Sequence, residues 1–194
     1  PDRNTEQGWR DYVLLLFLYN TGARAEEAAS LQIKDLFMPK GKGLPVVTIT
    51  GKGNKKRRCP LWDNTRRELR TLIGKGEPDD HVFKNRLNQP MTRFGVYEMV
   101  TRHAMKLAAR MPSIKEKRVS PHTIRHTTAT HLLQAGVDIN TIRAWLGHVS
   151  VETTNIYAEV NMEMKAKALL NCEIKAKKSK KHWRDDENLM AFLD

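Results

Sequence analysis

The sequence of 194 residues has few cysteines, no long apolar run and fewer acidic than basic side chains. Its two cysteines, Cys59 and Cys172, lie far apart and form no metal or redox motif, which fits a protein of the reducing cytosol. The apolar run over residues 13–19 is seven residues long, whereas a membrane span needs roughly 20. We therefore expect a cytoplasmic protein without a membrane partner. Because the sequence starts at Pro1 rather than Met and shows no signal peptide, we also expect a fragment whose N-terminal part is missing.

Basic residues dominate the charge, since 34 Lys and Arg stand against 22 Asp and Glu and give a formal net charge of +12. Such an excess usually accompanies a polyanionic partner, and nucleic acid fits this chain better than an acidic membrane. On composition alone, a soluble basic protein without such a partner is the alternative.

Helical patterns fill most of the chain, and one group of short strands interrupts them. Before residue 120, the helical patterns cover residues 7–20, 26–31, 62–73 and 92–109. The strand patterns, with glycine-rich turns between them, cover residues 33–38, 46–50 and 57–61. We therefore predict a mainly α-helical (α+β) domain with a small antiparallel β-meander over residues 1–170. Residues 171–194 are predicted to form a basic linker and an amphipathic helix, which we expect to dock on a neighbouring protomer.

One segment, residues 120–157, gathers side chains that suit phosphate chemistry. Ser120 and Pro121 mark a helix start, with a hydroxyl N-cap and a proline at the first helical position. On that helix His122 and Arg125 lie one turn apart on one face.

The same segment continues with a second helix, predicted over residues 138–147 and ended by a glycine. His148 follows this helix end directly, and Tyr157 comes nine residues later. A basic chain that collects arginine, histidines and tyrosine in this way is suited to binding a phosphate.

Two earlier positions carry a possible ion pair. Arg24 and Glu27 are three residues apart at the start of a predicted helix, so the carboxylate can hold the guanidinium. On these two residues alone, a surface ion pair worth a few tenths of a kcal/mol is the simpler interpretation.

A lysine-rich turn follows in the meander. Lys52 has a glycine on either side, which lets the backbone approach another molecule closely. Lys55, Lys56 and Arg57 add positive charge and are candidate DNA contacts. A solvated loop is the alternative for this turn.

Other chemistries lack their motifs. His122 and His126 have the i, i+4 spacing of a zinc helix, but Thr123 stands where a metalloprotease needs glutamate and no third ligand is near. The sequence has no G-x-S-x-G elbow, no phosphate-binding G-x-x-x-x-G-K-[ST] loop and no convincing acidic cluster for a two-metal nuclease.

The chemistry that remains after these exclusions is phosphoryl transfer by protein side chains alone. Arg24 and Arg125 supply planar forks for the non-bridging oxygens of a phosphodiester. His122 and His148 are further donors or proton carriers. A tyrosine can attack phosphorus once it loses its proton, and a lysine on a mobile hairpin can protonate the leaving oxygen.

The ordered motifs T-G-A-R-x-x-E, G-K-G-N-K, H-x-x-R-H, L-G-H and I-Y occur between residues 21 and 157. In this order they resemble the catalytic domain of the tyrosine recombinases, which include phage integrases and Xer-type recombinases. The resemblance covers roughly residues 7–170. It implies a site-specific DNA recombinase that works on double-stranded DNA without ATP, metal or another cofactor.

The resemblance also implies a role for each matching residue. Tyr157 would be the nucleophile that forms a 3′-phosphotyrosyl link, Lys52 would protonate the leaving oxygen, and His122 would assist proton transfer. The scissile phosphate would be bound by Arg24, Arg125 and His148, and Glu27 would have a supporting role.

Family members also carry an N-terminal core-binding domain, which we expect to be absent from this chain, and a C-terminal segment that packs into an adjacent protomer of a tetramer on DNA. The ending H-W-R-D-D-E-N-L-M-A-F-L is similar to integrases of mobile elements. Two alternatives stay open: a type IB topoisomerase-like enzyme that relaxes DNA, and a catalytically silent DNA-binding module on the same fold.

Overall fold

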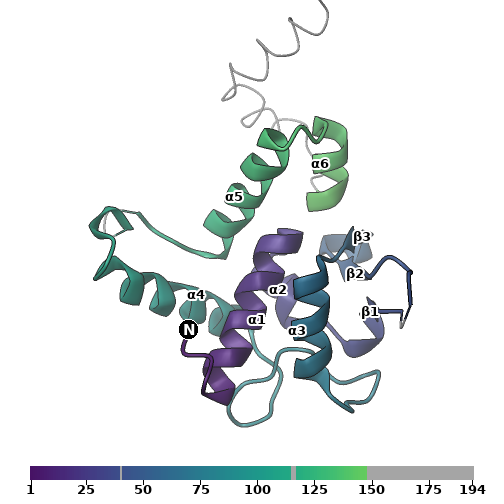
Figure 1. The fold of residues 1–194 in the computed structure, drawn as a ribbon, viewed down its shortest axis with the longest axis horizontal. Helices are drawn as coiled ribbons and strands as arrows, with labels where there is room; N and C mark the ends of the chain where they lie inside the picture. Colours follow the sequence, from purple (N-terminus) through teal and green to yellow (C-terminus); the bar gives the residue numbers. More distant parts are fainter. Residues whose placement is uncertain (40, 115–116, 148–194) are drawn as a thin grey trace, which may run out of the picture. The chain divides into compact units, whose positions relative to one another are not determined.

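The computed structural model describes residues 1–39, 41–114 and 117–147. The chain divides into two units, Pro1–Val160 and Asn161–Asp194, and all described residues belong to the first. Its helices (Figure 1) are α1 (Glu6–Thr21), α2 (Ala25–Ala29), α3 (Asp63–Ile73), α4 (Arg93–Ala108), α5 (Pro121–Gln134) and α6 (Ile139–Leu146). The strands are β1 (Leu36–Phe37), β2 (Val46–Thr50) and β3 (Lys56–Pro60), and the short 3-10 turns are η1 (Ile33–Asp35), η2 (Lys52–Asn54) and η3 (Pro112–Ile114).

Helix α1 forms the centre of the hydrophobic core. Its side chains Val13, Leu14, Phe17 and Leu18 are completely buried, and the helix packs against α3 and α5. The helix starts where the Thr5 hydroxyl accepts the Gly8 N–H at 3.1 Å, as an N-cap requires. Within the described residues, no helix is both long and apolar enough to cross a membrane.

The sheet is the predicted antiparallel meander in the order β1-β2-β3. Val47 and Ile49 of β2 and Cys59 of β3 point into the core, so the sheet is covered on one face. The predicted first strand, residues 33–38, is wrong in its first half. Its backbone N–H groups at residues 33 and 34 donate to carbonyls of residues 80 and 78 rather than to β2, and η1 forms there instead.

A buried carboxylate ties α4 to α1. Asp11 accepts hydrogen bonds from Arg102 at 2.7 Å and His103 at 2.8 Å and pairs with Arg10. Burial alone would raise the pKa of Asp11, but these partners outweigh it and hold the pKa below its ordinary value. His103 therefore has a structural role, as a partner of this buried carboxylate.

Helices α5 and α6 lie side by side (Figure 1). They confirm the predicted Ser120 cap and the predicted start and end of the second helix. Ser120 caps α5 with Pro121 at its first position, and the Asp138 side chain caps α6. Gly147 ends α6 with a left-handed backbone, φ 64°, a conformation that glycine adopts without strain.

The end of α1 allows a paired test of close packing. Gly22 has φ 61°, and a Cβ there would lie 2.4 Å from Leu146 Cδ2. Gly53 has a similar φ of 73°, but a Cβ there would meet no atom within 4 Å. We expect Gly53→Ala to lower the free energy of unfolding by about 1 kcal/mol, and Gly22→Ala by about 2 kcal/mol more because of the clash. Urea unfolding measures both; equal losses would contradict the close packing of Gly22.

Candidate active site

Two adjoining hollows share the residues Arg24, Gly51 and Lys52. One, of about 990 Å³, extends along β3 to α6, and the other, of about 890 Å³, extends along α2 to the start of α4. We call the two together the basic groove. Its cationic side chains are Arg24, Lys52, Lys55, Lys56, Arg57, Arg58, Arg93 and Arg143.

Arg24 is the N-cap residue of α2 and faces the groove with 45% of its side chain exposed. Its Nη1 donates to Glu27 Oε1 at 2.8 Å, and its backbone N–H donates to Glu27 Oε2 at 2.8 Å. One carboxylate therefore fixes both the backbone and the guanidinium of this arginine.

Glu27 is buried, and this corrects the interpretation of its pair with Arg24 as a surface ion pair. A second guanidinium, that of Arg57, binds both carboxylate oxygens, Nη1 at 3.0 Å and Nη2 at 2.7 Å. Burial alone would raise the pKa of Glu27, but Arg57 and then Arg24 outweigh it and lower the pKa to about 2. Sequence spacing missed this contact because Arg57 is 30 residues further along the chain.

Arg57 itself is not placed as a DNA contact. Its side chain is 9% exposed, and its Nε donates to the Trp145 carbonyl at 2.9 Å. Its guanidinium is thus engaged inside the protein, which favours a structural role over the predicted contact with DNA. Lys55 and Lys56 are exposed and line the groove, and their contact with DNA stays a prediction.

Lys52 lies in η2, at the tip of the hairpin between β2 and β3, and is exposed. A Cβ on the preceding Gly51 would lie 3.0 Å from Glu27 Oε1. The glycine thus lets the hairpin approach the Glu27 carboxylate, which brings Lys52 to the same groove as Arg24.

Arg125 is buried, with 3% of its surface exposed. Its Nη1 donates to the Gly22 carbonyl and its Nη2 to the Leu146 carbonyl, both at 2.6 Å. The guanidinium therefore joins the turn that leads to Arg24 to the last residue of α6. This places its charge in a fixed position before any ligand arrives.

His122 is exposed on α5 and contacts a histidine that the sequence analysis considered only as a zinc ligand. The Nε2 atoms of His122 and His126 are 2.7 Å apart, so one donates and the other accepts. Burial, followed by the charges of His122 and Arg125, lowers the pKa of His126. The pair can thus hold one shared proton. His148 and Tyr157 lie outside the described residues.

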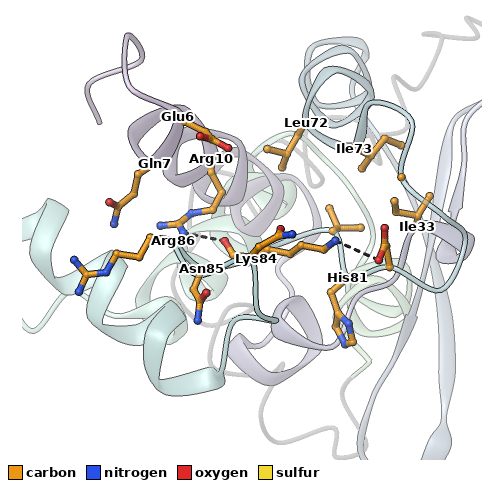
Figure 2. A pocket seen from close by; sticks show the side chains of 14 residues that line it. Glu6, Gln7, Arg10, Ile33, Leu72, Ile73, His81, Lys84, Asn85 and Arg86 are labelled. Atoms are coloured by element: carbon orange, nitrogen blue, oxygen red, sulfur yellow. Dashed lines mark hydrogen bonds and ion pairs between the residues drawn. The ribbon is translucent and has the colours of Figure 1, made fainter.

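A separate pocket of about 490 Å³ borders the start of α1 (Figure 2). Arg10 Nη1 donates to the Lys84 carbonyl at 2.9 Å, and Lys84 Nζ pairs with Asp80 at 3.2 Å. The pocket contains no member of the predicted catalytic set among the described residues that line it. The basic groove, and not this pocket, is therefore the candidate active site.

The low pKa of Glu27 makes stability depend on pH. Because the pKa falls from 4.5 to about 2 on folding, the stabilisation is complete above about pH 5.5 and is lost as pH falls through the folded value. The difference corresponds to about 3 kcal/mol, of which about 2 kcal/mol is lost by pH 3. Urea unfolding of the parent and of Glu27→Gln should show a stability gap that shrinks by this amount between pH 6 and pH 3. A gap that is the same at both pH values would contradict the charged, buried pair.

Comparison with known proteins places this geometry in a family. The sequence matches the phage integrase family over residues 2–164. It is 40% identical over 196 residues to the integrase/recombinase protein y4rC of Sinorhizobium fredii, covering 100% of this chain and 58% of that protein. It is 35% identical over 180 residues to the tyrosine recombinase XerC of Staphylococcus haemolyticus, covering 92% of this chain and 59% of that protein. The chain thus spans a little under three-fifths of the length of these relatives.

Comparison with solved structures leads to the same family. The XerA recombinase superposes with a TM-score of 0.67 at 26% identity, covering 85% of this chain and 58% of that one. The XerH recombinase in a post-cleavage complex with its difH substrate gives a TM-score of 0.66 at 26% identity, covering 85% and 46%. The chain therefore belongs to the phage integrase family of tyrosine recombinases.

Proposed function

We propose that this chain carries the catalytic domain of a site-specific DNA recombinase or integrase, which cuts and rejoins strands through a covalent 3′-phosphotyrosyl intermediate. The observation that carries the proposal is the pairing of Arg24, held by a buried carboxylate, with Lys52 in one basic groove. Membership of the family supports it, as do related recombinases whose structures contain substrate DNA before and after cleavage.

The phosphate is the first part of the proposed reaction. As phosphorus is attacked, negative charge builds on its non-bridging oxygens. Arg24 and Arg125 stabilise that charge, and His148 donates a further hydrogen bond. The buried ion pairs and backbone contacts of the two arginines support this role, because donors that are already oriented need no rearrangement during the reaction.

Proton transfer is the second part. The Tyr157 Oη attacks phosphorus, the bond between phosphorus and the 5′-oxygen breaks, and the tyrosine becomes joined to the 3′-phosphate. The leaving 5′-oxygen takes a proton from Lys52, while the tyrosine proton passes to His122. His126 can then share the proton through its 2.7 Å contact with His122. One phosphoester bond replaces another, so the reverse attack by a 5′-hydroxyl rejoins the strand.

Assembly is the third part of the proposal. The partner is double-stranded DNA, which Lys55 and Lys56 contact along the groove. The protein therefore works in the cytoplasm, at the nucleoid. Residues 171–194 dock on a neighbouring protomer, and a homo-tetramer on DNA couples successive strand exchanges. A core-binding domain that precedes this segment in the whole protein would complete the contacts around DNA. The gene for the protein belongs to a mobile element.

The test is covalent trapping in EDTA on a nicked duplex that carries the end of the element. We expect a protein–DNA adduct of retarded mobility that is absent in Tyr157→Phe and unchanged in Tyr12→Phe, whose hydroxyl lies between α1 and α3. Arg125→Ala should slow adduct formation by about 100-fold or more if its charge stabilises the transition state.

Four outcomes would contradict the proposal. An adduct that persists in Tyr157→Phe would remove the nucleophile, and parent-like cleavage by Arg125→Ala would remove the phosphate-binding role. DNA binding without any adduct, in the whole protein with its N-terminal part, would favour a silent DNA-binding module. Relaxation of supercoiled DNA without recombination would instead favour the topoisomerase-like alternative.

A further inference from the structure

We propose that Arg57, which has no place in the predicted catalytic set, is a positioning residue that fixes the phosphate-binding arginine Arg24 relative to the end of helix α6. The inference rests on the proposed function. It also replaces the earlier expectation that Arg57 contacts DNA.

The first step is the engagement of every nitrogen of the Arg57 guanidinium. Nη1 and Nη2 bind the two oxygens of Glu27 at 3.0 and 2.7 Å, and Nε binds the Trp145 carbonyl at 2.9 Å. A planar fork that pairs with a carboxylate in this bidentate way fixes its orientation as well as its distance. Arg57 thus links α2, β3 and α6 through one rigid group.

The second step is the effect on Arg24. The Glu27 oxygen that accepts Arg57 Nη1 also accepts Arg24 Nη1 at 2.8 Å. The carboxylate therefore lies between a buried arginine and one that is half exposed to the groove. The position of the exposed guanidinium depends on the carboxylate, and the position of the carboxylate depends on Arg57.

The third step is the end of α6. The last carbonyls of a helix lack partners within the helix and carry the negative end of its dipole. Arg57 binds the carbonyl of Trp145 and Arg125 binds that of Leu146. At the next residue, Gly147, a Cβ would lie 3.1 Å from Arg57 Cδ, so the chain passes directly over this arginine. Two guanidinium groups therefore fix the point from which the chain continues to residue 148.

A buried Arg–carboxylate pair with no link to the groove provides a matched control. Arg10 has a side chain 10% exposed, pairs with the buried Asp11, and donates to a backbone carbonyl, that of Lys84. It borders the separate pocket of Figure 2. Breaking either pair leaves a carboxylate buried with fewer partners, so both should destabilise the protein. Only Arg57 should also affect cleavage.

The experiment compares Arg57→Gln with Arg10→Gln in the covalent-trapping assay, at saturating DNA and at a temperature where circular dichroism shows both folded. We expect the adduct rate of Arg57→Gln to fall by roughly 100-fold, as a small misplacement of catalytic groups can produce. Arg10→Gln should stay within about threefold of the parent, since its pair lies outside the groove. Arg57→Lys, which keeps the charge but not the fork, should lose about as much as Arg57→Gln.

A pH profile and a double variant separate positioning from stability. Without Arg57, burial acts on Glu27 with less opposition and raises its pKa, so the Arg57→Gln rate should fall with decreasing pH where the parent rate is flat. Removing the buried charge in Glu27→Gln/Arg57→Gln should recover melting temperature but not the adduct rate.

The inference is overturned if Arg57→Gln or Arg57→Lys cleaves like the parent, if Arg10→Gln loses as much as Arg57→Gln, or if the double variant recovers both stability and rate. Should the parent form no adduct at all, the proposed function fails, and this inference fails with it. When the parent does form the adduct, an unaffected Arg57 variant shows that only the inference about Arg57 is wrong.

Discussion

The arrangement of the basic groove depends on one buried carboxylate between two guanidinium groups. Glu27 binds Arg24, which is half exposed to the groove, and Arg57, which is nearly buried. Such a group is stable in the interior only when its charge is fully paired, so the three side chains must come together for the domain to fold. The groove arginine Arg24 is thereby oriented by a contact that folding itself enforces.

The hydrophobic frame brings the parts of this site together. Helix α1 supplies the buried centre, and its end at Gly22 offers the carbonyl that Arg125 binds. The close fit between Gly22 and Leu146 brings the end of α6 to the same place. The two helix ends contribute backbone carbonyls that guanidinium groups bind, and the start of α2 contributes an N–H that the Glu27 carboxylate binds.

Features that depend on neighbouring residues could be predicted from the sequence, whereas features that depend on distant residues could not. The caps at Ser120 and Asp138 and the stop at Gly147 were predictable because each depends on a few adjacent residues. Half of the strand at residues 33–38 was mispredicted, since its backbone partners lie more than 40 residues away. The motif order predicted Arg24 and Lys52 as site residues, and the structure places both at the groove. The contacts of Arg57 were not predictable, because its partners Glu27 and Trp145 lie 30 and 88 residues away in the sequence.

The most direct test of this account is the exchange of the Arg57 Nε–H with water, followed by nuclear magnetic resonance in the protein without DNA. The hydrogen bond to Trp145 and the burial of the side chain predict exchange about tenfold or more slower than for the exposed Arg58. They also predict that Glu27→Gln speeds the exchange of Arg57 alone. Exchange of Arg57 as fast as that of Arg58 would show that the buried link is not formed before DNA binds, and would contradict the account.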